Sequence, residues 1–118
     1  MREISQGNIV SERSTGDPAS RVLIERQDYA KRGRYVGTIP GEHGIARLEY
    51  RRERDDLLIA EHTETSESFQ RKGVAEALVQ RMVEDARAEG FKIYALCTYV
   101  DDQRRRHPEW SDVFRTFG

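Results

Sequence analysis

The fold is decided by residues 57–100, which read LLIAEHTETSESFQRKGVAEALVQRMVEDARAEGFKIYALCTYV. Within this stretch, residues 73–90 carry apolar side chains at helical spacing on one face: Ala75, Leu78, Val79, Met82 and Ala86. Gly90 supplies a helix stop, and residues 91–100 are rich in the β-branched and aromatic side chains typical of strands. The order strand, helix, strand predicts a right-handed crossover between two parallel strands.

Upstream of this unit, short extended segments alternate with turn signals. The segments RVLIER (21–26), RYVGTI (34–39), GIARLEY (44–50) and DDLLIAEHTE (55–64) predict four strands in an antiparallel meander. Residues after Val100 predict a short helix through Arg106, which Pro108 ends. We therefore expect an α/β (α+β) domain over residues 21–118, in which antiparallel strands precede a parallel strand-helix-strand unit and a short C-terminal helix. Residues 1–20 lack a period of 2 or 3.6 and predict a mobile leader.

Composition narrows the class of protein. The chain has 118 residues and a formal net charge of -1, and residues 21–118 carry 18 basic and 18 acidic side chains, which argues against a nucleic-acid partner. No apolar run is long enough to span a membrane, and the N-terminus lacks the apolar segment of a secretory signal, so we expect a cytoplasmic protein. Cys97 is the single cysteine, which excludes an intramolecular disulfide and a multi-cysteine zinc site, and we expect no bound metal.

The crossover predicts that three chemical features meet at one edge of the sheet. These are His62 near the end of one strand, the loop QRKG (70–73) before the helix, and Cys97 near the end of the next strand. Strand alternation predicts that His62 shares a face with Leu58 and Ala60, and that Cys97 shares a face with Ile93 and Ala95. Taken singly, His62 is as consistent with a structural histidine, and Cys97 is more consistent with a buried small hydrophobe.

The loop before the helix favours an anion. Backbone N–H groups at a helix N-terminus are unpaired, and Gly73 has no Cβ to obstruct a ligand that approaches them. Arg71 and Lys72 add positive charge. The alternative is that Gly73 only eases entry into the helix and that the two cations form a solvated rim. The spacing is not that of a P-loop.

From Glu61 onward, the run EHTETSESFQRKGVAEALVQRMVEDARAEGFKIYALCTYV, followed by RRRHPEWSDV, resembles the minimal branch of the GNAT-type N-acetyltransferase superfamily, the YjdJ-type domain. The resemblance weakens upstream, toward Arg21. Gln70, Gly73 and Ala75 match the superfamily's loop signature, and the HT, CTYV and RHPEW motifs follow the order found in the branch. Two positions differ from the branch: Arg71 stands where a glycine is common, and Gln103 stands where an aromatic residue is usual.

The resemblance implies an acetyl-coenzyme A binding loop made by Gln70, Arg71, Lys72, Gly73, Val74 and Ala75. It also implies transfer of the acetyl group to a primary amine, with His62 and Cys97 at the two active-site positions. A base is chemically required because an alkylammonium is not a nucleophile until it loses a proton. His62 is the candidate base, and Cys97 permits a second route through a covalent acetyl-thiol, which we favour less than direct transfer.

Three hypotheses follow. The first is a small acetyl-coenzyme A dependent N-acetyltransferase that acts on a lysine or terminal amine of a polypeptide, since so short a chain leaves few residues for an enclosed acceptor pocket. The second is a non-catalytic acyl-coenzyme A binding or protein-interaction module on the same fold. The third is a His/Cys hydrolase unrelated to coenzyme A, which the lack of an evident orienting Asn or Asp disfavours.

Overall fold

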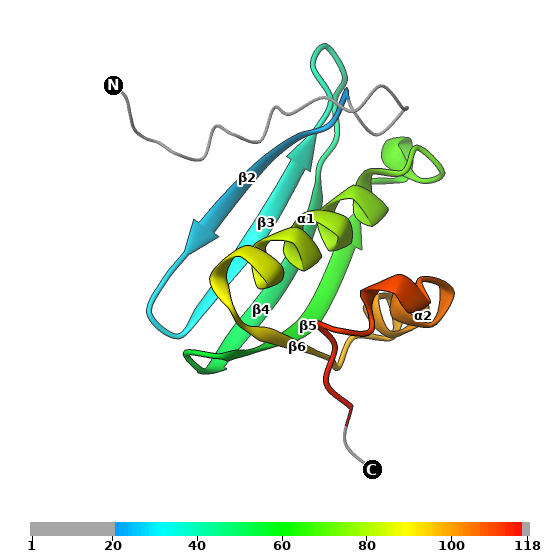
Figure 1. Cartoon of the computed structure of the whole chain (residues 1–118). Helices are drawn as coiled ribbons and strands as arrows, with labels where there is room; N and C mark the ends of the chain where they lie inside the picture. Colours follow the sequence, from blue (N-terminus) through cyan, green and yellow to red (C-terminus); the bar gives the residue numbers. More distant parts are fainter. Residues whose placement is uncertain (1–20, 117–118) are drawn as a thin grey trace.

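The computed structural model describes residues 21–116, which form a mixed five-stranded sheet with helices on one side (Figure 1). The predicted leader, residues 1–20, lies outside the described residues. In chain order the elements are β2 (Leu23–Asp28), β3 (Arg32–Thr38), β4 (Ala46–Arg54), β5 (Leu57–Thr65), η3 (Glu67–Phe69), α1 (Val74–Glu89), β6 (Lys92–Ala95), α2 (Thr98–Arg106) and η4 (Pro108–Trp110).

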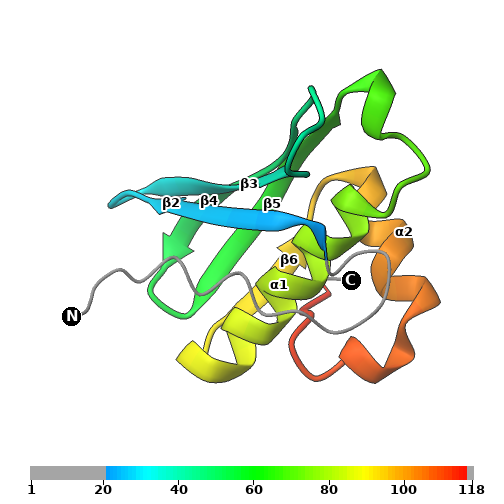
Figure 2. The same cartoon turned by 90° about the horizontal axis from the view of Figure 1, so that it is seen from above.

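The sheet has the predicted topology. Strands β2 to β5 pair consecutively and antiparallel, and β6 joins β5 in parallel after the α1 crossover. Figure 2 shows α1 lying across one face of the sheet, with α2 beside it near β6. We call the face of the sheet that α1 covers the helix face. We call the opposite face, which no described helix covers, the open face. Neither helix of the described residues is long and apolar enough to cross a membrane.

The core lies between α1 and the sheet. Leu78, Val79 and Met82 of α1 are buried against Leu48 and Leu58 of the sheet. Val74, Ala77 and Val83 join the buried stripe, whereas Ala75, which the periodicity assigned to this stripe, is only half-buried. The apolar period of 3.6 therefore identified the helix, but Ala75 in its first turn faces a pocket rather than the core.

A polar network ties the C-terminal half of α1 to the first strands. Arg26 on β2 donates a hydrogen bond of 3.1 Å to Asp85 on α1, and the Tyr35 hydroxyl donates one of 2.8 Å to the same carboxylate. Burial, reinforced by Asp85, raises the pKa of Tyr35 above its usual range. The hydroxyl is therefore a neutral donor that satisfies a partly buried carboxylate.

An irregularity between β4 and β5 controls which side chains reach each face. Leu48 pairs with Thr63, and Glu49 pairs with His62, but Tyr50 pairs with Ala60, so β5 contains one extra residue at this point. A β-bulge of this kind reverses the alternation beyond it. Thr63 therefore shares the helix face with the buried Leu48, and His62 shares the open face with Glu49.

The last strand is much shorter than expected. The sequence predicts a strand over residues 91–100, but β6 ends at Ala95 and α2 begins at Thr98. The β-branched and aromatic side chains of residues 98–100 sit in a helix, because tertiary packing of the buried Val100 overrides their strand propensity. Cys97 consequently precedes a helix instead of ending a strand, whereas the predicted helix end at Arg106 is confirmed.

Gln103 on α2 is a buried polar residue with an unsatisfied acceptor. Only 7% of its surface is exposed, and its Oε1 atom has no hydrogen-bond partner among the residues that the structure describes. A buried unsatisfied polar group costs about 1–3 kcal/mol. We expect Gln103→Met, which keeps the volume and removes the amide, to raise the free energy of unfolding by about 1 kcal/mol in urea titrations. Exchange of the neighbouring exposed Asp102 for Asn is the control, and a loss of stability in Gln103→Met would contradict this interpretation.

Candidate functional site

The loop between β5 and α1 has a backbone shape that few residues adopt. It begins at the buried Phe69, which anchors η3 in the core. Arg71 has φ = +69° and Gly73 has φ = +75°, both in the left-handed region. A non-glycine residue pays a steric cost of roughly 1–2 kcal/mol there, and this explains in physical terms why glycine suits the Arg71 position. Gly73 is the N-cap of α1 and provides no side chain to cap it.

This conformation leaves several backbone donors free. The N–H groups of Gly73, Val74, Ala75 and Glu76 have no hydrogen-bond acceptor among residues 21–116, and the first helical bond is made by Ala77 to the Gly73 carbonyl at 3.0 Å. Four adjacent donors at the positive end of a 16-residue helix make a strong anion-binding site. A Cβ at Gly73 would meet no atom within 4 Å, so the space in front of the donors is open.

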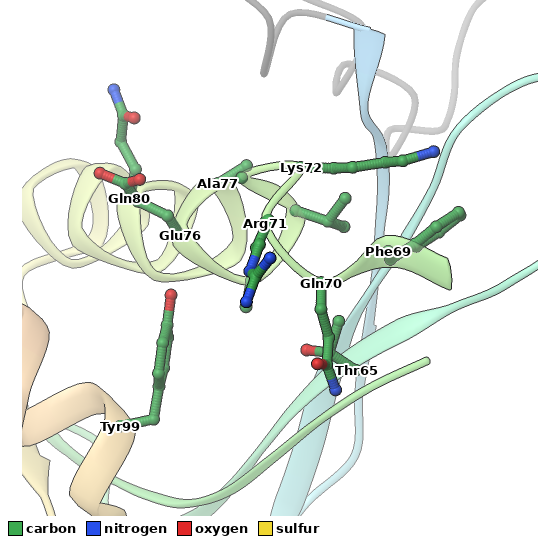
Figure 3. Close-up of a pocket in the computed structure, with 12 residues that line it drawn as sticks. Thr65, Phe69, Gln70, Arg71, Lys72, Glu76, Ala77, Gln80 and Tyr99 are labelled. Atoms are coloured by element: carbon green, nitrogen blue, oxygen red, sulfur yellow. The ribbon is translucent and has the colours of Figure 1, made fainter. Parts of the chain in front are cut away.

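A cavity of about 670 Å³ lies at these donors. Figure 3 shows the side chain of Arg71 pointing into it, with Tyr99 of α2 on the other side. The remaining lining residues come from the end of β5, the loop and the first turns of α1: Thr65, Phe69, Gln70, Lys72, Gly73, Val74, Ala75, Glu76, Ala77 and Gln80. The structure therefore brings all six loop residues predicted from the sequence to one pocket.

The two loop cations differ in their roles. Lys72 points away from the pocket in Figure 3, and its Nζ lies 2.6 Å from Glu42 of the β3–β4 loop. This ion pair holds the pKa of Glu42 below its usual value. Arg71 makes no hydrogen bond or ion pair with residues 21–116. The guanidinium of Arg71 is thus the side-chain charge that is free to meet an anion in the pocket.

Tyr99 was not anticipated from the sequence, because residues 98–100 were assigned to a strand. Its position on the second residue of α2 places the half-buried ring against the pocket. Burial raises the pKa of the Tyr99 hydroxyl, with Glu76 and Asp102 adding to the shift. The hydroxyl is therefore a neutral hydrogen-bond donor at physiological pH.

A gap opens between β5 and the chain that follows β6. Ala60 and Ala95 are the last residues paired between the two strands, and the N–H groups of Leu96 and Cys97 both donate to the Ala60 carbonyl, at 3.0 and 2.9 Å. Beyond this point β5 continues to Thr65, while the other chain turns into α2. The pocket reaches Thr65 on β5 and Tyr99 on α2, so it continues toward this gap.

The structure corrects the predicted arrangement of His62 and Cys97. The Sγ of Cys97 lies 3.6 Å from the Oγ1 of Thr63, on the helix face. His62 is exposed on the open face, because the bulge reverses the alternation that the sequence suggested. Thr63, not His62, is therefore the neighbour of the thiol. The two predicted residues flank the gap from opposite sides of the sheet.

The part of the chain between residues 21 and 116 contains no group of three or more His, Cys, Asp or Glu side chains that could hold a metal ion. The site's chemistry is that of backbone donors, one guanidinium, a phenol, a thiol and an imidazole.

Comparisons with known proteins agree with this geometry. The sequence model of the GCN5-related N-acetyltransferase family matches residues 34–113, which is more than half of the chain. The fold is similar to that of a GCN5-like protein from Staphylococcus aureus solved by NMR, with a TM-score of 0.61, 21% sequence identity, and coverage of 80% of this chain and 90% of that chain. A search of curated proteins finds no match.

Proposed function

Because this chain belongs to the GCN5-related N-acetyltransferase family, we propose that it transfers the acetyl group of acetyl-coenzyme A to a primary amine, on a lysine or terminal amine of a polypeptide. The observation that carries the proposal is the set of unpaired N–H groups at the start of α1, which open into a cavity of about 670 Å³. The cytoplasmic location remains a prediction from the sequence.

The pocket suits the phosphate end of coenzyme A. The N–H groups of residues 73–76 and the guanidinium of Arg71 supply positive potential, and a volume of about 670 Å³ is in the range of pockets that bind extended small molecules. Tyr99 adds a neutral donor on the opposite wall. In this arrangement the thioester end of the donor extends from the loop toward the gap that opens beyond Ala60 and Cys97.

In this proposal, the acetyl donor and the residue that accepts the proton lie on opposite faces of the sheet at the gap. Coenzyme A supplies an activated acetyl thioester from the helix face. His62 on the open face accepts a proton from the incoming ammonium, so that the neutral amine nitrogen attacks the carbonyl carbon. The C–N bond forms and the C–S bond breaks. The proton that the attacking nitrogen then loses passes to the sulfur, which leaves as the free thiol, while His62 releases the proton of the ammonium to solvent. In this proposal, N–H groups of β5 beyond Ala60, where pairing with β6 ends, stabilise the carbonyl oxygen as it gains charge.

The direct route is favoured over a covalent acetyl-Cys97. Activation of the thiol requires a base in hydrogen-bond range, and the neighbour of Cys97 is the Thr63 hydroxyl, which is not a base at neutral pH. We expect Cys97→Ala to keep kcat within about threefold of wild type, where loss of a covalent nucleophile would abolish turnover. Failure of Cys97→Ala to turn over, with acetyl-coenzyme A binding intact, would instead support the covalent route.

Arg71→Gly separates two properties of the loop. Glycine relieves the positive-φ strain of about 1 kcal/mol but also gains entropy in the unfolded chain, so the melting temperature should change little. Loss of the guanidinium should raise the Kd of acetyl-coenzyme A about tenfold, measured by calorimetry. Lys72→Gln is the matched control, because the ammonium of Lys72 is engaged by Glu42 and points away from the pocket. Equal losses in the two variants would contradict the assignment of Arg71 to the phosphates.

The activity itself is tested by incubating the chain with acetyl-coenzyme A and lysine-containing peptides, while free thiol is followed by a colour reaction and the peptide by mass spectrometry. The proposal expects one acetyl group on the peptide for each thiol released. Saturable binding of acetyl-coenzyme A with no turnover on any amine would support the non-catalytic module. The absence of binding at millimolar concentrations would remove both functions.

A further inference from the structure

A second hollow lies on the open face of the sheet, away from the coenzyme A pocket. It has a volume of about 230 Å³ over strands β3, β4 and β5, and it is lined by Tyr29, Arg32, Gly33, Arg34, Glu49, Tyr50 and Glu61. This is smaller than the roughly 300–1,000 Å³ of pockets that enclose a small molecule. Its size suits one or two side chains of a chain that lies along the surface.

Two charged side chains in this hollow have no partner. Glu49 is half-buried, and neither it nor Arg32 makes a hydrogen bond or ion pair through its side chain with any of residues 21–116. Neighbouring charges on this face are engaged: Glu61 lies 2.6 Å from Arg51, Glu64 pairs with Arg47, and Arg34 donates to Gln27 at 2.7 Å. The hollow therefore presents one free carboxylate and one free guanidinium.

The free carboxylate lies next to the proposed base. Glu49 and His62 are directly opposite each other on β4 and β5, and both face the open side. Side chains of directly opposite residues have Cβ atoms about 4.5–5.5 Å apart, so an ammonium held by Glu49 is within reach of His62. An acceptor amine bound here approaches the gap from the face opposite to the coenzyme A pocket.

The free guanidinium belongs to Arg32, which is a diagonal cross-strand neighbour of Glu49. Arg34 is opposite Glu49, and Arg32 is opposite Arg51, so Arg32 and Glu49 are diagonal neighbours on adjacent strands, about 7–8 Å apart. In an extended peptide, two side chains on the same face are separated by two residues, or about 6.6–7 Å. The spacing of the two protein charges thus matches alternate side chains of an extended polypeptide.

Given the proposed acetyl transfer, we propose that the acceptor is a lysine in an extended polypeptide segment with an acidic residue two positions away. Glu49 binds the lysine ammonium beside His62, and Arg32 binds the acidic side chain. Tyr29, which is 57% exposed at the rim of the hollow, packs against the segment. The open face of β3 to β5 is the surface that selects the acceptor.

The test is an NMR titration of the ¹⁵N-labelled chain, with and without coenzyme A. One peptide is Gly-Glu-Gly-Lys-Gly-Glu-Gly, and its partner carries Gln in place of both Glu residues. We expect the amide signals of Arg32, Glu49 and His62 to shift, and the acidic peptide to bind about threefold to fivefold more tightly. Arg32→Gln should remove this preference, and Glu49→Gln should weaken both peptides.

The control variants are Arg54→Gln on β4 and Glu64→Gln on β5. The native side chains are ion-paired with Asp56 and Arg47, so neither substitution should change the affinity for either peptide. Equal affinity for the two peptides, shifts away from the open face, or no binding of either peptide would overturn the inference. Its failure differs from failure of the proposed function. If the chain binds acetyl-coenzyme A and acetylates peptides without a preference for acidic neighbours, the proposed function stands and the inference about the acceptor fails. If the chain prefers the acidic peptide but never acetylates it, the peptide-binding site stands and the proposed function fails.

Discussion

Replacing Gly73 with glutamate is expected to raise the Kd of acetyl-coenzyme A by roughly 100-fold or more, since two like charges 4 Å apart near a protein surface repel by about 4 kcal/mol. The new carboxylate would stand among the unpaired N–H groups of Val74, Ala75 and Glu76, where the phosphates are proposed to bind. Because a Cβ at position 73 meets no atom within 4 Å, the effect arises from charge and not from a clash with the core.

Gly73→Ala is the control for backbone strain. Alanine carries the same cost of φ = +75°, about 1 kcal/mol of stability, and adds no charge. We expect its Kd to stay within about threefold of wild type, while thermal melts of the two variants show similar losses. Comparable Kd values for the alanine and glutamate variants would contradict the placement of the phosphates at this loop.

His62→Gln is expected to lower kcat by about 100-fold or more, because general-base catalysis typically contributes that factor. The Kd of acetyl-coenzyme A should not change, since His62 is exposed on the face opposite the pocket. This separation distinguishes a proton-transfer role from a structural one. The measurement is the kcat for a lysine peptide together with calorimetry of the same preparation.

Glu64→Gln controls for changes in the charge of the open face. Glu64 lies two residues beyond His62 on the same face of β5, and its carboxylate is ion-paired with Arg47. We expect this variant to retain wild-type kcat. Retention of full activity by His62→Gln would show that another group removes the proton, or that the amine arrives neutral.

The sequence predicted the parts of the fold that depend on strong local patterns. The helix expected over residues 73–90 is observed as Val74–Glu89, because the apolar period and the two flanking glycines agree with each other. The same agreement holds for the antiparallel strands, whose turns are marked by glycine and charged residues. The position of the loop over residues 70–73 was also predictable, since a loop that joins a strand to the following helix lies at the edge of the sheet.

The errors lie where long-range packing decides the outcome. Alternation along β5 cannot show a bulge, which depends on how β4 pairs with it, and so His62 was assigned to the wrong face. The propensities of residues 98–100 favoured a strand, and α2 begins after Cys97 without a side-chain cap, so no capping signal indicated the helix. Tyr99 as a wall of the pocket would have followed from that helix. The free carboxylate of Glu49 beside His62 needs the strand register and is not visible in the sequence.

The measurement that tests the central claim most directly is a titration of the ¹⁵N-labelled chain with acetyl-coenzyme A, followed by its amide signals. We expect saturable shifts at residues 71–76, where the phosphates are proposed to bind, together with shifts at Thr63 and Cys97 on the helix face of the gap. Signals that remain unchanged at millimolar acetyl-coenzyme A, or that move only on the open face, would contradict this claim.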